Sequence, residues 1–270
     1  MLTALLDTTI VTAASKQFEP PTIDEFFPPS FPFLDGTILE GLNRINMVQL
    51  IALIVLVLLL GFFAARSKVV PSKGQLVVEF ILGFAQKNIA EEVLGPKLGR
   101  KYAPLITTIF LMVLFFNLTG IVPGLNIAGS AQVAVPIVLA AISWVVFVGS
   151  GFKYRGMAFL KDALFPPGVP KPAYILLTPL EFISTFILRP FTLVIRLLAN
   201  MVSGHMLLAL CFISTNFLLI YADTAFKAFG VLTFASALVM ICFEVFIACL
   251  QAYIFAILTT VYINLSVHSH

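Results

Sequence analysis

The sequence is poor in charged residues. Asp, Glu, Lys and Arg together make up 11% of its 270 residues, whereas hydrophobic residues make up 60%. A soluble domain of this length needs a larger share of polar residues to cover its surface. The mean hydropathy of +1.06 points the same way. These values exclude a soluble globular domain and indicate an integral membrane protein.

Other features are scarce or absent. The three cysteines, Cys211, Cys242 and Cys249, lie inside apolar segments, and we interpret them as small buried hydrophobic side chains rather than a disulfide or metal site. No metal-ligand spacing and no Gly-rich phosphate loop occurs, so we expect no metal, no cofactor and no catalytic site in this chain. The net charge of +3 is small, and we expect no nucleic-acid partner. No internal repeat is evident, which argues against the inverted-repeat architecture of many secondary transporters.

Long apolar runs, in contrast, are abundant. Those at 47–65, 104–123 and 131–151 are each long enough to cross a bilayer as one helix. Between the first two, residues 74–102 place apolar side chains at helical spacing among Glu and Lys, which predicts an amphipathic helix on the membrane surface. Residues 1–45 are rich in proline and mildly acidic. We expect them to form an N-terminal segment on the outer side, without a cleaved signal peptide.

The remainder of the chain holds two longer apolar stretches, 174–221 and 225–265. As unbroken α-helices they would reach roughly 70 and 60 Å, about twice the ~30 Å bilayer core. Upright spans are therefore excluded, and tilting or kinks at Pro179 and Pro190 must absorb the excess length. We expect a long, tilted helical hairpin. The predicted fold class is all-α, with about five membrane-crossing helices in one membrane domain, 46–270.

Lys and Arg side chains cluster next to some of these spans and not others. Seven follow the first span, none lies in the turn after the second, and a further group follows the third. Those after the first span are Arg66, Lys68, Lys73, Lys87, Lys97, Arg100 and Lys101. The positive-inside rule therefore predicts that the N-terminus lies outside and the C-terminus inside.

Arg196 lies in the middle of 191–210, an apolar run long enough to span the membrane. A guanidinium cannot lose its proton, so in hydrocarbon it must be held by partners or by water. Asn200 and Ser203 follow it at i+4 and i+7, and Arg189 precedes it at i−7, so the four side chains share one helix face. Intramembrane charges of this kind mark functional sites.

Glu244 and Gln251 are the polar residues within the apolar run of the returning stretch. If Gln251 lies at the depth of Arg196, Glu244 lies about 10 Å toward the outer side, close to the level of His205. A carboxylate and an imidazole at that level are suited to relay protons. Glu181 lies fifteen residues before Arg196, near the inner surface. The outer and inner acids are thus separated by a permanent positive charge. This arrangement predicts two aqueous half-paths that do not join, with a mobile carboxylate of another subunit carrying the proton between them.

Two sequence segments carry a family resemblance. RPFTLVIRLLANMVSGHMLLAL at 189–210 and FEVFIACLQAYIFAILTTVYINL at 243–265 resemble the last two helices of subunit a of the F-type ATP synthase. FFNLTGIVPG at 115–124 is similar to the end of the second span in that family. The resemblance implies that Arg196 is the essential arginine. It also implies that four further residues occupy channel or arginine-supporting positions: Asn200, His205, Glu244 and Gln251.

The resemblance implies a proton-translocating stator subunit beside the rotating c-ring. The implied partners are the c-ring subunits, the peripheral-stalk subunit b, the remainder of the ATP synthase complex and the lipid bilayer. ATP chemistry would then take place on partner subunits. We expect an energy-transducing membrane, the bacterial plasma membrane in preference to the mitochondrial inner membrane.

The inner acid departs from the family pattern. Members commonly place it eight residues before the proline that is Pro190 here, whereas Glu181 precedes Pro190 by nine. An offset of one residue rotates a side chain by about 100° on an α-helix. Ser184 or Thr185 are therefore alternatives that share the lining of an inner path.

Less specific interpretations remain for each residue. Arg196 is compatible with a buried ion pair inside the bundle, Glu244 with simple neutralisation of His205, and Arg189 with an anchor that reaches the interface. For the whole chain, the alternatives are a self-contained secondary transporter or channel and a purely structural assembly subunit.

Overall fold

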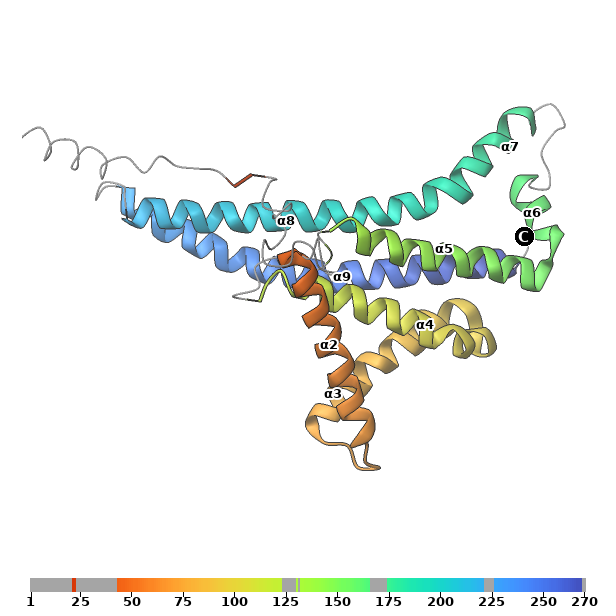
Figure 1. Ribbon diagram of the computed structural model, residues 1–270, viewed down its shortest axis with the longest axis horizontal. Coiled ribbons are helices and arrows are strands. Elements are labelled where there is room, and N and C mark those ends of the chain that lie inside the picture. Colours follow the sequence, from red (N-terminus) through yellow and green to blue (C-terminus); the bar gives the residue numbers. More distant parts are fainter. Residues whose placement is uncertain are drawn as a thin grey trace, which may run out of the picture. The chain divides into compact units, whose positions relative to one another are not determined.

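The computed structural model describes residues 21–22, 43–122, 130, 132–165, 174–220 and 226–268. The regular secondary structure of these residues is helical (Figure 1). Five helical stretches among them are long and apolar enough to cross a membrane: Arg44–Ala65, Lys73–Leu118, Ala134–Arg155, Tyr174–Ile220 and Lys227–Val267. The predicted all-α membrane fold is therefore confirmed.

Several predicted features fall outside the described residues. They include nearly all of the N-terminal segment 1–45, most of the turn after the second span and the turn between the two long helices. The chain divides into two compact units. Unit 1 consists of Met1–Phe27 and Ser203–Glu244, and unit 2 of Pro28–Val202 and Val245–His270.

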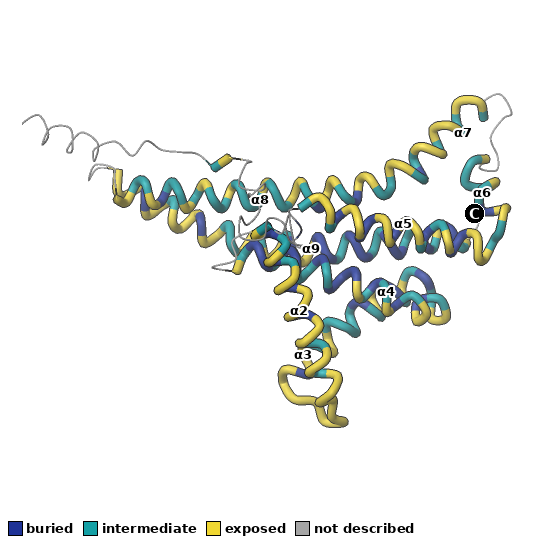
Figure 2. Tube along the Cα trace, viewed as in Figure 1, coloured by how far each residue is buried: buried dark blue, intermediate teal, exposed yellow. Residues whose placement is uncertain are grey.

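Helix α2 (Arg44–Ala65) is the first apolar span, in unit 2. It buries one stripe of side chains at helical spacing, Ile45, Val48, Ala52 and Leu56. Its other faces are also apolar but exposed (Figure 2). An apolar helix exposed on most sides is stable in hydrocarbon rather than in water.

The predicted surface helix is two helical segments rather than one. Helix α3 (Lys73–Gly83) continues through the π-helical η3 (Phe84–Glu91) into the start of α4 (Glu92–Leu118), where Gly95 breaks the helix with a φ of 76°. Only glycine adopts this backbone conformation without strain. Beyond the break, α4 returns along η3, as Figure 1 shows.

The return is tight at Gly99. A Cβ atom there would lie 2.5 Å from the Cα of Glu91, so even alanine does not fit. Arg100 Nε lies 3.5 Å from Glu91 Oε1 across the same contact. Residues 73–94 therefore form a hairpin with the second apolar span instead of running on to Tyr102 as a separate helix.

Helix α5 (Ala134–Arg155) packs against the second part of α9 (Lys227–Val267) through buried hydroxyl groups. The Ser143 and Thr259 hydroxyls lie 3.1 Å apart, and those of Ser150 and Ser266 lie 2.7 Å apart. Hydrogen bonds of this kind hold membrane helices together where no water competes. After α5, Gly156 leads into the short α6 (Met157–Leu164).

The fourth apolar stretch is interrupted between its two prolines. It consists of α7 (Tyr174–Phe182), the π-helical η6 (Ile183–Leu188) and α8 (Arg189–Ile220). Figure 1 shows α7 turning away from the line of α8 at η6. The sequence predicted kinks at Pro179 and Pro190, and the structure instead places a π-helical interruption between these two prolines.

One apolar cluster forms the core of unit 2. It joins buried residues of η3, α4, α5, α8 and α9, among them Ile89, Ile106, Leu139, Leu193 and Phe255. In Figure 2 the buried residues follow the inward sides of α4, α5 and α9. This cluster fixes which side of α8 faces the bundle.

Candidate functional site

Arg196 lies on the exposed side of α8. Leu193 and Leu197, three residues before it and one after it, are buried in the core of unit 2, whereas Arg196 itself is exposed. The two ion pairs among the described residues are Arg100 with Glu91 and Arg155 with Asp162. Neither involves Arg196. Within the described part of the chain, this guanidinium is thus not neutralised by an acid of its own chain.

Asn200 and Gln251 form a hydrogen bond between α8 and α9. Asn200 Nδ2 donates to Gln251 Oε1 at 2.8 Å. Because Asn200 is one helical turn from Arg196, Gln251 reaches α8 about 6 Å along the helix from the arginine.

Gln251 is 2% exposed, and its Nε2 has no hydrogen-bond partner among the described residues. A buried donor without an acceptor costs about 1–3 kcal/mol. The side-chain amide of Gln251 thus has a hydrogen-bond partner for its oxygen and none for its nitrogen among the described residues.

Arg189 is surrounded by aromatic rings of its own unit. Its guanidinium carbon lies 5.6 Å from the ring centre of Phe147 on α5 and 5.3 Å from that of Tyr262 on α9. Cation–π contacts of this kind stabilise a charge away from water. Arg189 is therefore held by contacts within the chain.

Glu181 is separated from Pro190 by the π-helical segment η6. A π turn bonds residue i to i+5 rather than i+4 and so absorbs one extra residue. This is the size of the offset between Glu181 and the family pattern. Of the two alternatives at this level, Thr185 is buried and Ser184 is partly buried.

In unit 1, the carboxyl group of Glu244 lies against the backbone of Gly204. A Cβ atom on Gly204 would be 2.9 Å from Glu244 Oε1. Gly204 directly precedes His205, and both His205 and Glu244 are partly buried, whereas Ser203 is exposed. Because Gly204 has no side chain, the carboxyl group of Glu244 on α9 can lie close to the α8 backbone, one residue before His205.

Sequence reasoning missed Gly204. The sequence does show a small residue within a long apolar helix at this position, which is a common feature of close helix contacts. Elsewhere in unit 1, the Thr215 hydroxyl donates to that of Thr233 at 3.0 Å, and Gly230 packs against Leu219. These contacts join the two helices of the hairpin.

The cysteines differ from the prediction. Cys242 and Cys249 are exposed and Cys211 is partly exposed, so the expectation of buried side chains is wrong for the first two. No cluster of three or more His, Cys, Asp or Glu side chains able to hold a metal occurs among the residues that the structure describes.

Comparison with known proteins identifies the family. The family model described as ATP synthase A chain matches residues 46–264. ATP synthase subunit a of Rhodococcus erythropolis is 43% identical over 264 residues, which cover 96% of this chain and 94% of that protein. Subunit a of Frankia alni is 36% identical, covering 93% and 86% of the two chains, and that of an Arthrobacter species is 33% identical, covering 94% and 95%. Matches of this extent show that the chain belongs to the ATP synthase A chain family, as a multi-pass membrane subunit of an ATP synthase.

Proposed function

We propose that this chain is the proton-translocating stator subunit of a rotary F-type ATP synthase, in which Arg196 separates two offset half-channels. The observation that carries the proposal is the exposed guanidinium of Arg196 in an apolar span, where no acid of the described chain neutralises it. A charge in hydrocarbon needs a partner of opposite sign. We infer that a carboxyl group of a c-ring subunit supplies it.

His205 and Glu244 form the outer half-channel in this proposal. Imidazole and carboxyl groups both exchange protons within the pH range of living cells when their surroundings favour it. The contact between Glu244 and Gly204 supports a close approach of the carboxyl group to the histidine segment. Protons from the outer water pass through these groups to a ring carboxylate, with Ser203 lining the path.

Arg196 acts between the two half-channels. It attracts a ring carboxylate that has released its proton, and its permanent charge keeps protons from passing directly between the two water-filled paths. Asn200 and Gln251 hold polar groups beside it. The buried Nε2 of Gln251 supports this role, because it is a donor without an acceptor among the described residues.

Glu181 forms the inner half-channel, through which the proton leaves after the ring has turned. The π-helical segment η6 supports this assignment, because the extra residue that it absorbs compensates the offset from the family pattern. Partly buried Ser184 contributes to the lining. Arg189 has a supporting role in this proposal, since it follows Glu181 by eight residues on the same apolar stretch.

The proposed path converts an electrical gradient into rotation. Each charge that crosses gains about 2.3 kcal/mol per 100 mV of membrane potential. Proton passage along this chain exerts a torque on the c-ring. ATP is made or hydrolysed on other subunits. The remaining partners are the peripheral-stalk subunit b and the rest of the complex.

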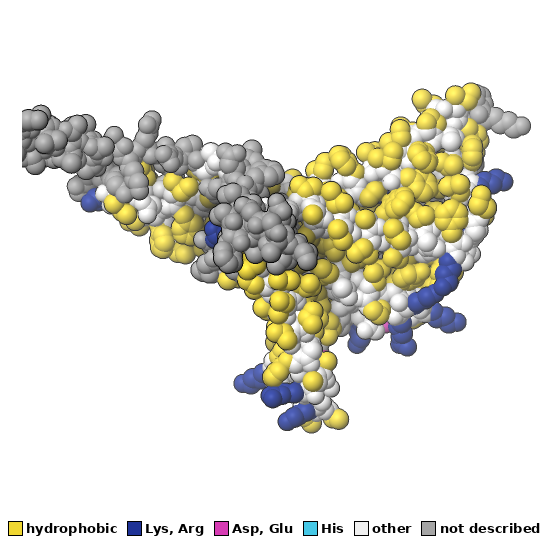
Figure 3. All heavy atoms as spheres, in the orientation of Figure 1, with side chains coloured by type: hydrophobic (Ala, Val, Ile, Leu, Met, Phe, Trp, Pro, Cys, Tyr) yellow, Lys and Arg dark blue, Asp and Glu magenta, His cyan; other side chains and the backbone are white. Residues whose placement is uncertain are grey.

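We place the protein in the bacterial plasma membrane, with the N-terminus outside and the C-terminus inside. Exposed Lys and Arg side chains gather where α2 ends, where α3 begins and around the start of α4 and the end of α5 (Figure 3). By the positive-inside rule these ends face the cytoplasm.

The test replaces Arg196 with Ala in the assembled complex. We expect ATP-driven acidification of inverted membrane vesicles to fall to background while the complex still assembles, because a ring carboxylate loses its fixed counter-charge. Arg66→Ala is the matched control, since Arg66 is an exposed arginine at the end of α2, stacked 4.6 Å from the ring centre of Phe62. Its pumping should stay normal. Normal pumping by Arg196→Ala would reject the stator mechanism, and transport of a solute by the purified chain alone would indicate a self-contained transporter.

A further inference from the structure

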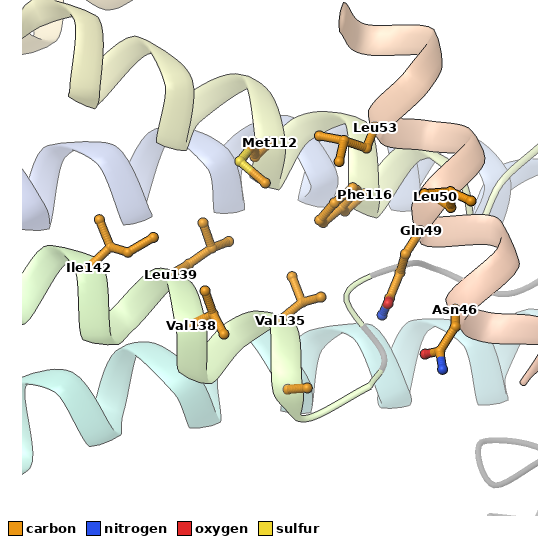
Figure 4. A pocket seen from close by; sticks show the side chains of 11 residues that line it. Asn46, Gln49, Leu50, Leu53, Met112, Phe116, Val135, Val138, Leu139 and Ile142 are labelled. Atoms are coloured by element: carbon orange, nitrogen blue, oxygen red, sulfur yellow. The ribbon is translucent and has the colours of Figure 1, made fainter. Parts of the chain in front are cut away.

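A cavity of about 350 Å³ lies between α2, α4 and α5 in unit 2. Its lining includes Leu50 and Leu53 from α2, Met112 and Phe116 from α4, and Val138 from α5 (Figure 4). These side chains are all apolar. The volume falls in the range of about 300–1,000 Å³ that is usual for small-molecule sites.

The polar groups of the cavity gather at one end. Asn46 and Gln49 carry its only side-chain amides, and Figure 4 shows both at the end away from Ile142. Gln49 Nε2 donates to Gln132 Oε1 at 3.1 Å, just before α5 begins. The cavity is thus amphipathic along its length.

The polar end lies near the ends of three candidate membrane spans. Helix α2 begins at Arg44, α5 begins at Ala134 and α4 ends at Leu118, all close to this end of the cavity. From Asn46 to Leu53 the helix rises about 10 Å, so the apolar part of the groove extends over about two turns of α2.

The cavity opens sideways onto the membrane. Leu50 is 52% exposed and Val138 is 56% exposed, although both line it. Because α2, α4 and α5 belong to candidate spans, hydrocarbon surrounds this opening rather than water. An empty apolar groove would lose dispersion contacts on both walls, so a hydrocarbon chain of the bilayer gains contacts by entering it.

We propose that this groove binds one acyl chain of a phospholipid whose headgroup lies at Arg44, Asn46 and Gln49. The exposed Arg44 gives the polar end a positive charge that complements a lipid phosphate. A phospholipid matches the groove better than an apolar transmembrane helix of another subunit, because it joins an anionic phosphate to an acyl chain as the groove joins a positively charged polar end to an apolar lining. The proposal does not depend on the direction or the ion of transport.

The test uses phosphatidylglycerol with a photoreactive diazirine in one acyl chain, added to the intact complex in nanodiscs. Mass spectrometry of the irradiated protein should find labels concentrated in residues 46–53 and 134–142. Val138→Trp fills the groove from α5 and should lower this labelling about tenfold, equivalent to about 1.4 kcal/mol of binding free energy. Leu53→Trp fills it from α2 and should do the same.

Val145→Trp is the matched control. Val145 lies two turns further along α5, is 59% exposed and does not line the cavity, so labelling of the two segments should stay at the level of the unmodified chain. Equal labelling in Val138→Trp, Leu53→Trp and the control would overturn the proposal. Absence of label from both segments in the intact complex would overturn it too, because it would show that a protein neighbour covers the groove.

Discussion

Two arginines on one helix have opposite surroundings. Arg189 and Arg196 are seven residues apart on α8 and share a helix face by spacing. Arg189 stacks on Phe147 and Tyr262, whereas Arg196 is exposed and forms neither of the ion pairs among the described residues. Among the described residues, the chain thus supplies two aromatic partners for Arg189 and no acidic partner for Arg196, and we propose that a neighbouring subunit supplies the latter.

This difference suggests a structural role for Arg189 and a functional role for Arg196 on the same helix. A guanidinium that rests on aromatic rings contributes to packing, and its removal affects stability first. A guanidinium in a membrane span without such contacts adds little to stability, and in the proposed function it acts on a group outside the chain. Arg189 thus serves as an anchor toward aromatic rings rather than only toward the membrane interface.

The largest expected effect comes from removing each arginine in turn. Arg196→Ala should abolish ATP-driven proton pumping, whereas Arg189→Ala should keep a measurable part of it, because the proposed function puts Arg189 beside the inner path and Arg196 between the two paths. Acidification of inverted vesicles, normalised to the amount of assembled complex, measures both. Equal loss of pumping in the two variants would contradict the proposed difference between Arg196 and Arg189.

The next effect concerns the outer acid. Gly204→Val should strongly reduce pumping, because its side chain needs the space where Glu244 Oε1 now lies. Gly149→Val is the control, since a Cβ atom at Gly149 meets no atom within 4 Å. If both valine variants pump alike, the Glu244 position has no bearing on transport.

A smaller effect is expected at the amide pair beside Arg196. Gln251→Leu removes the bond from Asn200 and should reduce pumping only in part, with a stability change of about 0.5–1.5 kcal/mol. Combining it with Asn200→Leu tests the contact itself. A double-mutant cycle should show a coupling energy of about 0.5–3 kcal/mol, and additive effects would mean that the two side chains act independently.

The smallest effect is one of stability alone. Arg189→Met should lower the unfolding free energy of the purified protein by about 0.5–2 kcal/mol through loss of the ring contacts. Arg196→Met should change it less, since Arg196 makes no such contact among the described residues. Thermal unfolding in nanodiscs compares the two, and the reverse order would contradict the proposed division of roles.

Much of the fold could be predicted because membrane-spanning helices must be apolar over most of their length, and such runs are easily recognised in a sequence. The first and third spans and the two long stretches follow directly from apolar runs of sufficient length. The reversal at Gly95 was missed, although Gly95 is followed by Pro96, a pair that often marks a turn. Periodicity continues on both sides of this break, so the pattern alone predicted one helix.

The candidate site was predictable only in part. A charge such as Arg196 stands out in an apolar run, but its exposure depends on which side of α8 the core covers, and that is decided by packing. The bond between Asn200 and Gln251 required the register of two helices far apart in sequence. The π-helical η6 arises from local packing that residue spacing does not reveal.

The most direct test of the central claim is a cryo-EM map of the assembled ATP synthase. We predict that the guanidinium of Arg196 faces a helix of the c-ring, within reach of a ring carboxyl group, while Arg189 remains between the rings of Phe147 and Tyr262. A map in which Arg196 points into lipid, or is paired with an acid of its own chain, would contradict the account.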